Sequence, residues 1–148
     1  MSKKTQIHPD KVKAYEATDY RLGHTDQDTV LNINKRSEPL ANLLAVNGVN
    51  CGAFLTAFNP QGTIQSDEAN AQGHAELASK LQELGVKAIE GSGSEGSSSE
   101  DGKKWPAEKS YFALGLALEH AKAIGIDFDQ DAIVWVGPDS VPQLILLR

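Results

Sequence analysis

Alternating hydrophobic and polar stretches along the chain predict a series of short helices and strands. Apolar residues recur at helical spacing in three segments, residues 37–47, 66–84 and 116–124. The first two segments each begin at a serine, a residue type that accepts hydrogen bonds from the first free backbone N–H groups of a helix. Each is followed by a glycine, which readily adopts the left-handed conformation that ends helices. These features predict two well-capped helices and a third without a clear cap.

The strands are predicted by continuous or alternating apolar runs. Residues 51–58 are apolar except for one threonine, which is typical of a central strand covered on both faces. Further runs predict strands at residues 86–89, 110–115, 132–136 and 142–147. Several of these runs alternate with the predicted helices. We therefore expect helices and strands to be mixed along the chain.

Paired short strands near the two ends of the chain predict hairpins, within residues 20–33 and 132–147. The N-terminal segment, residues 1–19, has a helical pattern. Together these elements predict one α+β domain over residues 1–148, with a mixed sheet and three to four helices. The sequence shows no internal repeat and no interdomain linker.

One stretch, residues 90–104, contains only glycine, serine, acidic residues and two lysines. Because it has no apolar side chain to bury, we expect a flexible surface loop inside the domain. Its glycines could suggest a phosphate-binding loop. Its acidic residues would repel a phosphate, and the required lysine pattern is missing.

Composition narrows the class of protein. The 148 residues include 14 basic and 20 acidic side chains, a formal charge of −6, which argues against a nucleic-acid-binding protein that neutralises phosphates. No apolar run approaches the roughly 18 residues of a membrane span, and the basic start lacks the apolar stretch of a signal peptide. A lone Cys51 predicts a reducing compartment. We expect an acidic cytoplasmic protein that contacts neither membrane nor nucleic acid.

The first polar group of interest follows the predicted central strand. Thr56 and Asn59 lie at its carboxyl end, and Asn70 lies one turn inside the next helix. Ligands of open α/β sheets gather at such strand ends, and the helix start near Ser66 offers free N–H groups to an anion. The alternative is structural, with Asn59 and Asn70 only fixing a turn.

The second polar group surrounds the start of a later strand. Glu108 and Ser110 are two residues apart, so they share one face, and Trp105 can cover that face. A carboxylate beside an aromatic ring has a raised pKa, which suits general acid–base catalysis. Alternatively, Glu108 binds backbone N–H groups or pairs with a basic side chain. Gln130 can reach the same region or satisfy a loop.

Four motifs carry a resemblance to a known family. They lie at residues 53–60, 66–70, 105–110 and 130–135, in the forms T-A-x-N-P, a helical Asn, W-x-x-E-x-S and a Gln before the late strand. In this order they resemble the bacterial family DUF3293, from about Tyr20 to the end of the chain. Members usually carry Gly where this chain has Asp129. The family has no known function, so the resemblance implies a small cytosolic bacterial domain but no reaction.

These observations lead to three functional hypotheses. The first is a module that binds a small polar or anionic ligand, with a nucleotide as one candidate, near Asn59, Asn70 and Glu108. The second is a hydrolase with Glu108 as general base and Asn59 or Thr56 as polarising donor. The third is a domain whose acidic surface binds a basic protein partner. No motif predicts a metal or cofactor, and the oligomeric state stays open.

Overall fold

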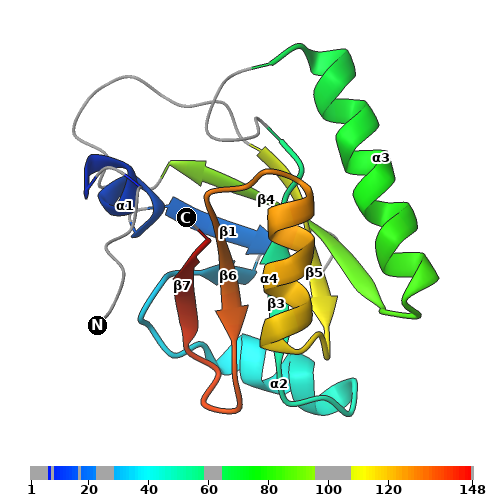
Figure 1. Ribbon diagram of the computed structural model, residues 1–148. Coiled ribbons are helices and arrows are strands. Elements are labelled where there is room, and N and C mark those ends of the chain that lie inside the picture. The colour runs from blue at the N-terminus through cyan, green and yellow to red at the C-terminus, as the bar shows by residue number, and fades with distance from the viewer. Residues whose placement is uncertain are drawn as a thin grey trace.

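The computed structural model describes residues 7, 9–16, 18–22, 29–58, 65–95 and 108–147. Within these ranges the chain forms four helices and one sheet of seven strands (Figure 1). The helices are α1 (Pro9–Glu16), α2 (Glu38–Val46), α3 (Asp67–Glu83) and α4 (Leu118–Asp127). The strands are β1 (Thr18–Leu22), β2 (Thr29–Leu31), β3 (Gly52–Leu55), β4 (Ala88–Glu95), β5 (Glu108–Leu114), β6 (Ala132–Val136) and β7 (Pro142–Leu146). The prediction of one α+β domain is confirmed.

The sheet has the strand order β2-β1-β4-β5-β3-β6-β7, and every neighbouring pair is antiparallel. The expected mixed sheet is therefore wrong. Helix α3 joins β3 to β4, which run in the same direction, but β5 lies between them. Helix α4 likewise joins β5 to β6 across β3. Two crossovers that each skip one strand give the β-α-β-β-α-β arrangement of ferredoxin-like domains.

Helices α3 and α4 cover one face of this sheet, which we call the helical face (Figure 1). The apolar core on this side combines Leu77 and Leu81 of α3 with Ala121 and Ile124 of α4. A glycine lets α3 pack closely against the segment that follows β3. A Cβ atom at Gly73 would lie 3.2 Å from the carbonyl oxygen of Ala57, which is closer than most side chains allow.

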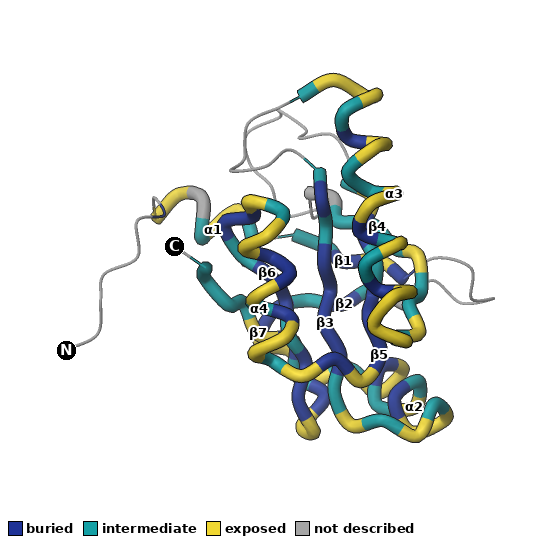
Figure 2. The backbone as a smooth tube through the Cα atoms, turned by 45° about the vertical axis from the view of Figure 1, so that its right-hand side comes forward, coloured by how far each residue is buried: buried dark blue, intermediate teal, exposed yellow. Residues whose placement is uncertain are grey.

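The opposite face curls over a second core, which α2 closes from one side. Tyr20 and Phe54 meet edge to face there, with ring centroids 5.2 Å apart. Phe54 points to this face while Ala53 and Leu55 point to the helical face. Strand β3 is buried along its whole length (Figure 2). The prediction of a central strand covered on both faces is confirmed, although the strand is only four residues long.

The predicted caps of α2 and α3 are confirmed. The side chain of Ser37 accepts a hydrogen bond from the third residue of α2, and Ser66 does the same in α3. Gly48 and Gly85 follow these helices with φ angles of 68° and 69°, in the left-handed region that favours glycine. The terminal hairpins are also present, as β1 with β2 and β6 with β7. No helix in the described ranges is long and apolar enough to cross a membrane.

The expected loop at residues 90–104 needs correction. Residues 90–95 belong to β4, an interior strand between β1 and β5, while residues 96–107 lie outside the described ranges. On one face of this strand, aromatic rings from β1 and β3 lie beside its glycines. A Cβ at Gly91 would lie 3.1 Å from the ring of Phe54, and one at Gly93 would lie 3.6 Å from the ring of Tyr20. Gly91 therefore makes room for the ring of Phe54, whereas the position of Gly93 lies at an ordinary contact distance from Tyr20.

Candidate functional site

The segment that leaves β3 is held by side chains from two directions. The hydroxyl of Thr56 donates to the carbonyl of Lys109 at 2.8 Å and accepts from the backbone N–H of Phe58 at 3.0 Å. The amide nitrogen of Gln130 donates to the carbonyl oxygens of Phe58 and Phe128, at 3.1 and 3.3 Å. Thr56 and Gln130 thus meet at the end of β3, where both stabilise the backbone.

The backbone conformation before Gln130 explains why Asp129 can stand where the family that this sequence resembles usually has glycine. Asp129 has a φ angle of 54°, in the left-handed region. Glycine, the residue usual at this position in the family, has no Cβ to clash there, and aspartate is among the side chains that tolerate the region best. Aspartate at position 129 is therefore compatible with the turn that positions Gln130.

Asn70 lies on the sheet-facing side of α3, in the helix's first turn, and is buried. Its side-chain oxygen accepts a hydrogen bond from the amide of Gln65 at 2.7 Å. One turn further along the same side of α3 lies His74. The first half of this helix thus presents polar side chains to the sheet, whereas its second half presents Leu77 and Leu81.

His74 belongs to an aromatic cluster that sequence analysis did not identify as a site. Its ring stacks on Tyr111 of β5, with centroids 4.3 Å apart and planes 8° from parallel. The ring of Phe58 meets His74 edge to face at 5.9 Å. Glu90 and Lys109 share the same face of the sheet, since Glu90 pairs with Tyr111 and Lys109 precedes it by two residues. We call these five residues the His74 cluster.

Burial lowers the pKa of His74, and the charge of Lys109 acts in the same direction, while Glu90 opposes them. Burial also raises the pKa of the Tyr111 hydroxyl, with Glu90 adding to the effect. Both side chains are therefore held in their neutral forms near pH 7. The i, i+4 spacing of Asn70 and His74 on an otherwise apolar helix side was the sequence signal that could have revealed this cluster.

The structure divides the predicted site between the two faces of the sheet. Glu108 and Ser110 share one face, as expected, but it is the face of Phe112, opposite α3 and Asn70. The buried hydroxyl of Ser110 donates to the carbonyl of Glu108 at 3.2 Å. On this side, burial raises the pKa of Tyr20, and the charge of Glu108 adds to it.

Asn59 and Trp105 lie outside the described residues. Thr56, Asn70 and Gln130 lie at the same end of the sheet as Glu108, because β3 ends where β5 begins. The strand-end rule that suggested this site applies to parallel sheets. It therefore carries no weight in this antiparallel one.

Other candidate groups have structural surroundings. Cys51 is half-buried, and burial raises the pKa of its thiol, which makes it a poor nucleophile. His120 is exposed on α4. The described residues contain no group of three or more His, Cys, Asp or Glu side chains placed to hold a metal ion.

The fold and these side chains define a small α+β domain with a ferredoxin-like core and a polar, aromatic cluster at one end of its helical face. The chain belongs to the family described as a protein of unknown function, DUF3293, whose model matches residues 55–133, over half of the 148 residues. The match runs from the end of β3 to β6, across both crossovers, and includes all seven side chains predicted from sequence. No curated protein and no solved structure matches the chain.

Proposed function

We propose that the protein binds a small polar or anionic ligand, of nucleotide size, at the end of the helical face where α3 begins. The observation that carries this proposal is the placement of polar His74 against the rings of Phe58 and Tyr111, with buried Asn70 one turn before it on the same side of α3. Polar side chains on the inner side of a helix are unusual and informative. Ligand sites typically combine aromatic walls with a few polar groups that orient the ligand.

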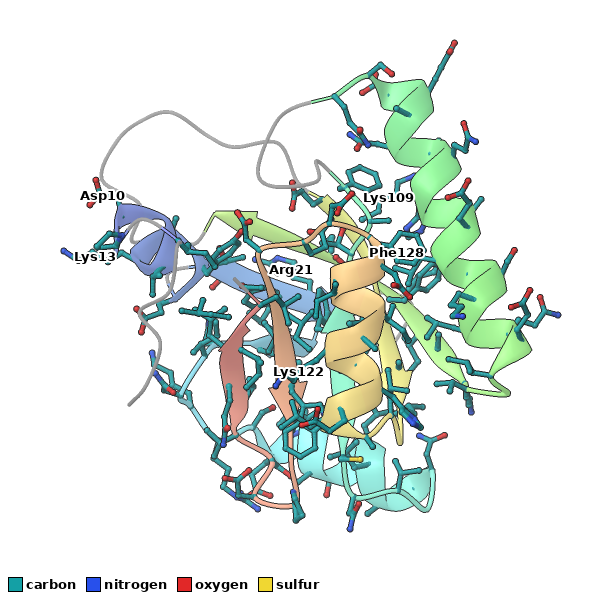
Figure 3. The ribbon with its side chains drawn as sticks, viewed as in Figure 1. Asp10, Lys13, Arg21, Lys109, Lys122 and Phe128 are labelled. Carbon is teal, nitrogen blue, oxygen red and sulfur yellow. The ribbon has the colours of Figure 1, made fainter. Side chains whose placement is uncertain are left out.

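Local charge supports an anionic ligand in a protein whose overall charge is negative. Lys109 is exposed at the end of β5 that lies beside the first turns of α3 (Figure 3). The positive end of the α3 dipole points to the same end of the sheet. Lys109 can therefore attract an anionic group towards Asn70 and His74. Glu90, the cross-strand partner of Tyr111 on β4, would orient a ligand that also carries a hydrogen-bond donor.

The proposed site uses Thr56 and Gln130 as supports and does not include Glu108 or Ser110, which face the other side of the sheet. We further propose a cytoplasmic bacterial setting for this ligand-binding role. The single cysteine, which has no partner for an internal disulfide, supports a reducing compartment.

The test is a titration of the labelled protein with AMP, inorganic phosphate and acetate, followed by backbone amide spectra and by the thermal midpoint. We expect shifts at the amides of Asn70, His74, Lys109 and Tyr111. A ligand at about 100 times its Kd would also add about 2.7 kcal/mol of stability. If no probe moves the midpoint or any amide signal, the proposed function is wrong.

A matched pair of variants separates local from general charge effects. Lys109→Gln and Lys122→Gln each remove one positive charge, but Lys122 lies on α4, away from the His74 cluster (Figure 3). Lys109→Gln should weaken AMP binding about two- to fivefold, the range expected for one exposed ion pair. Lys122→Gln should leave affinity unchanged. Equal losses in both variants would mean that AMP responds only to net charge.

A further inference from the structure

The orientation of the His74 ring gives its two nitrogens different roles. Parallel stacking on Tyr111 and the edge contact with Phe58 hold the plane of the ring. Nδ1 is buried and has no hydrogen-bond partner in the described part of the chain. The ring as a whole is only half-buried. Its accessible edge is therefore the one remote from Nδ1, which carries Nε2.

The buried Nδ1 determines where the ring carries its proton. A neutral imidazole has one N–H donor and one bare nitrogen. An unpaired N–H is the rarer group in protein interiors, so the bare nitrogen belongs at the buried position. The imidazolium form would place an N–H there as well, which burial disfavours. Neutral His74 with its proton on Nε2 is the form that fits these surroundings.

The charged and titratable groups around the ring agree with this form. Burial is the largest influence on the His74 pKa and lowers it, Glu90 of β4 raises it, and Lys109 of β5 lowers it. Tyr111, stacked on the ring, is neutral near pH 7 like any tyrosine of pKa about 10, and burial raises its pKa further. Lys109 is thus the cation of the cluster, and His74 contributes a neutral donor.

We propose that the Nε2–H of neutral His74 and the ammonium of Lys109 together bind an oxyanion, a phosphate or a carboxylate, of the ligand. This inference rests on the proposed ligand site and names the ligand group recognised there. The Nε2–H donor of neutral His74 is available at every pH above the pKa of His74. Binding of an oxyanion whose own charge does not change, such as acetate, should therefore stay constant from about pH 7 to 9, whereas binding by an imidazolium of ordinary pKa, about 6.5, would weaken as the pH rises through 7.

The experiment records long-range proton–nitrogen spectra of the imidazole side chains, with His74 assigned from the His74→Gln variant. At pH 7.5 we expect the proton on Nε2. Inorganic phosphate or acetate should move the Nε2 signal more than the Nδ1 signal. Acetate keeps the same charge from pH 7 to 9, so its Kd over this range tests the neutral donor directly. Binding of phosphate alone would assign a phosphate, and binding of acetate alone a carboxylate.

Substitutions at His74 separate the contribution of its Nε2–H donor to binding from the contribution of its ring stacked on Tyr111. His74→Phe keeps a ring against Tyr111 but removes Nε2–H, and it should weaken binding of the effective probe about tenfold, as expected for a hydrogen bond to a charged group. His120→Phe changes an exposed histidine on α4 and should leave affinity unchanged. His74→Gln restores a neutral donor and should recover part of the affinity.

The proposal is overturned if the proton lies on Nδ1, or if His74→Phe binds like the wild type. In either case, shifts at the amides of Asn70 and Lys109 would still show a ligand site, so the proposed function would stand without this contact. Absence of any shift with phosphate, acetate and AMP would overturn both proposals together.

Discussion

Two glycines of β4 offer a sharp test of the sheet. A Cβ atom at Gly91 would lie 2.4 Å from the carbonyl oxygen of Arg21 and 3.1 Å from the ring of Phe54. Because the first contact is with backbone, the strands must move apart to admit a methyl group. A Cβ at Gly93 would have its nearest neighbours, in Thr18 and Tyr20, at 3.6 Å, an ordinary contact distance.

Gly91→Ala should therefore lower the free energy of unfolding by about 1–3 kcal/mol or more, the usual cost of overpacking an interior site. Gly93→Ala should be neutral, or stabilise by about 0.4–1 kcal/mol, since alanine restricts the unfolded chain without straining the folded one. The two changes are chemically identical and two residues apart on one face of β4. The difference between their unfolding free energies therefore reports how well a methyl group fits at each position.

The assay is equilibrium unfolding in urea, followed by tryptophan fluorescence at pH 7.5. With a urea slope of about 2 kcal/mol per molar, a loss of about 2 kcal/mol lowers the midpoint by about 1 M. Equal midpoints for Gly91→Ala, Gly93→Ala and the wild type would refute the placement of β4. Residues 90–95 would then behave as the loop that their composition predicts.

Further predictions concern single side chains. Gln130→Leu should lower the unfolding free energy by about 0.5–1.5 kcal/mol, since it removes the side-chain donor to the partly buried carbonyl of Phe58, whereas Gln72→Leu on the exposed side of α3 should change little. Burial lowers the His74 pKa, so the unfolded state takes up a proton first as the pH falls. The urea midpoint should therefore drop between pH 7.5 and 5.5, and less so in His74→Phe; identical drops would contradict this. Ser37→Ala should lower the thermal midpoint through loss of the α2 cap, by about 0.5–2 kcal/mol in stability, and an unchanged midpoint would count against that cap.

Local sequence was sufficient where one residue decides the structure. Ser66 and Gly85 predicted the ends of α3 because a cap depends on hydrogen bonds and φ angles within a few residues. The uninterrupted apolar run at β3 predicted a strand buried on both faces. The motif order also identified the family that the match to residues 55–133 confirms.

The candidate site was predicted less completely. Thr56 and Gln130 both hydrogen-bond to the backbone of Phe58, just after β3, an arrangement that the sequence did not predict. Asn70 and Glu108 come to the same end of the sheet but to opposite faces, which depends on strand register and on the side where α3 packs. The stacking of His74 on Tyr111 could not be predicted from the sequence, because the two residues are distant in the chain.

The sequence by itself determined the helices, their caps, the central strand, the terminal hairpins and the α+β class, because these follow from hydrophobic period and short-range hydrogen bonds. Only the tertiary structure decided that β5 lies between β3 and β4, which makes the sheet antiparallel. It also made a strand of residues 90–95, where the rings of Phe54 and Tyr20 lie beside Gly91 and Gly93. Such contacts join residues far apart in the chain, and no local pattern encodes them.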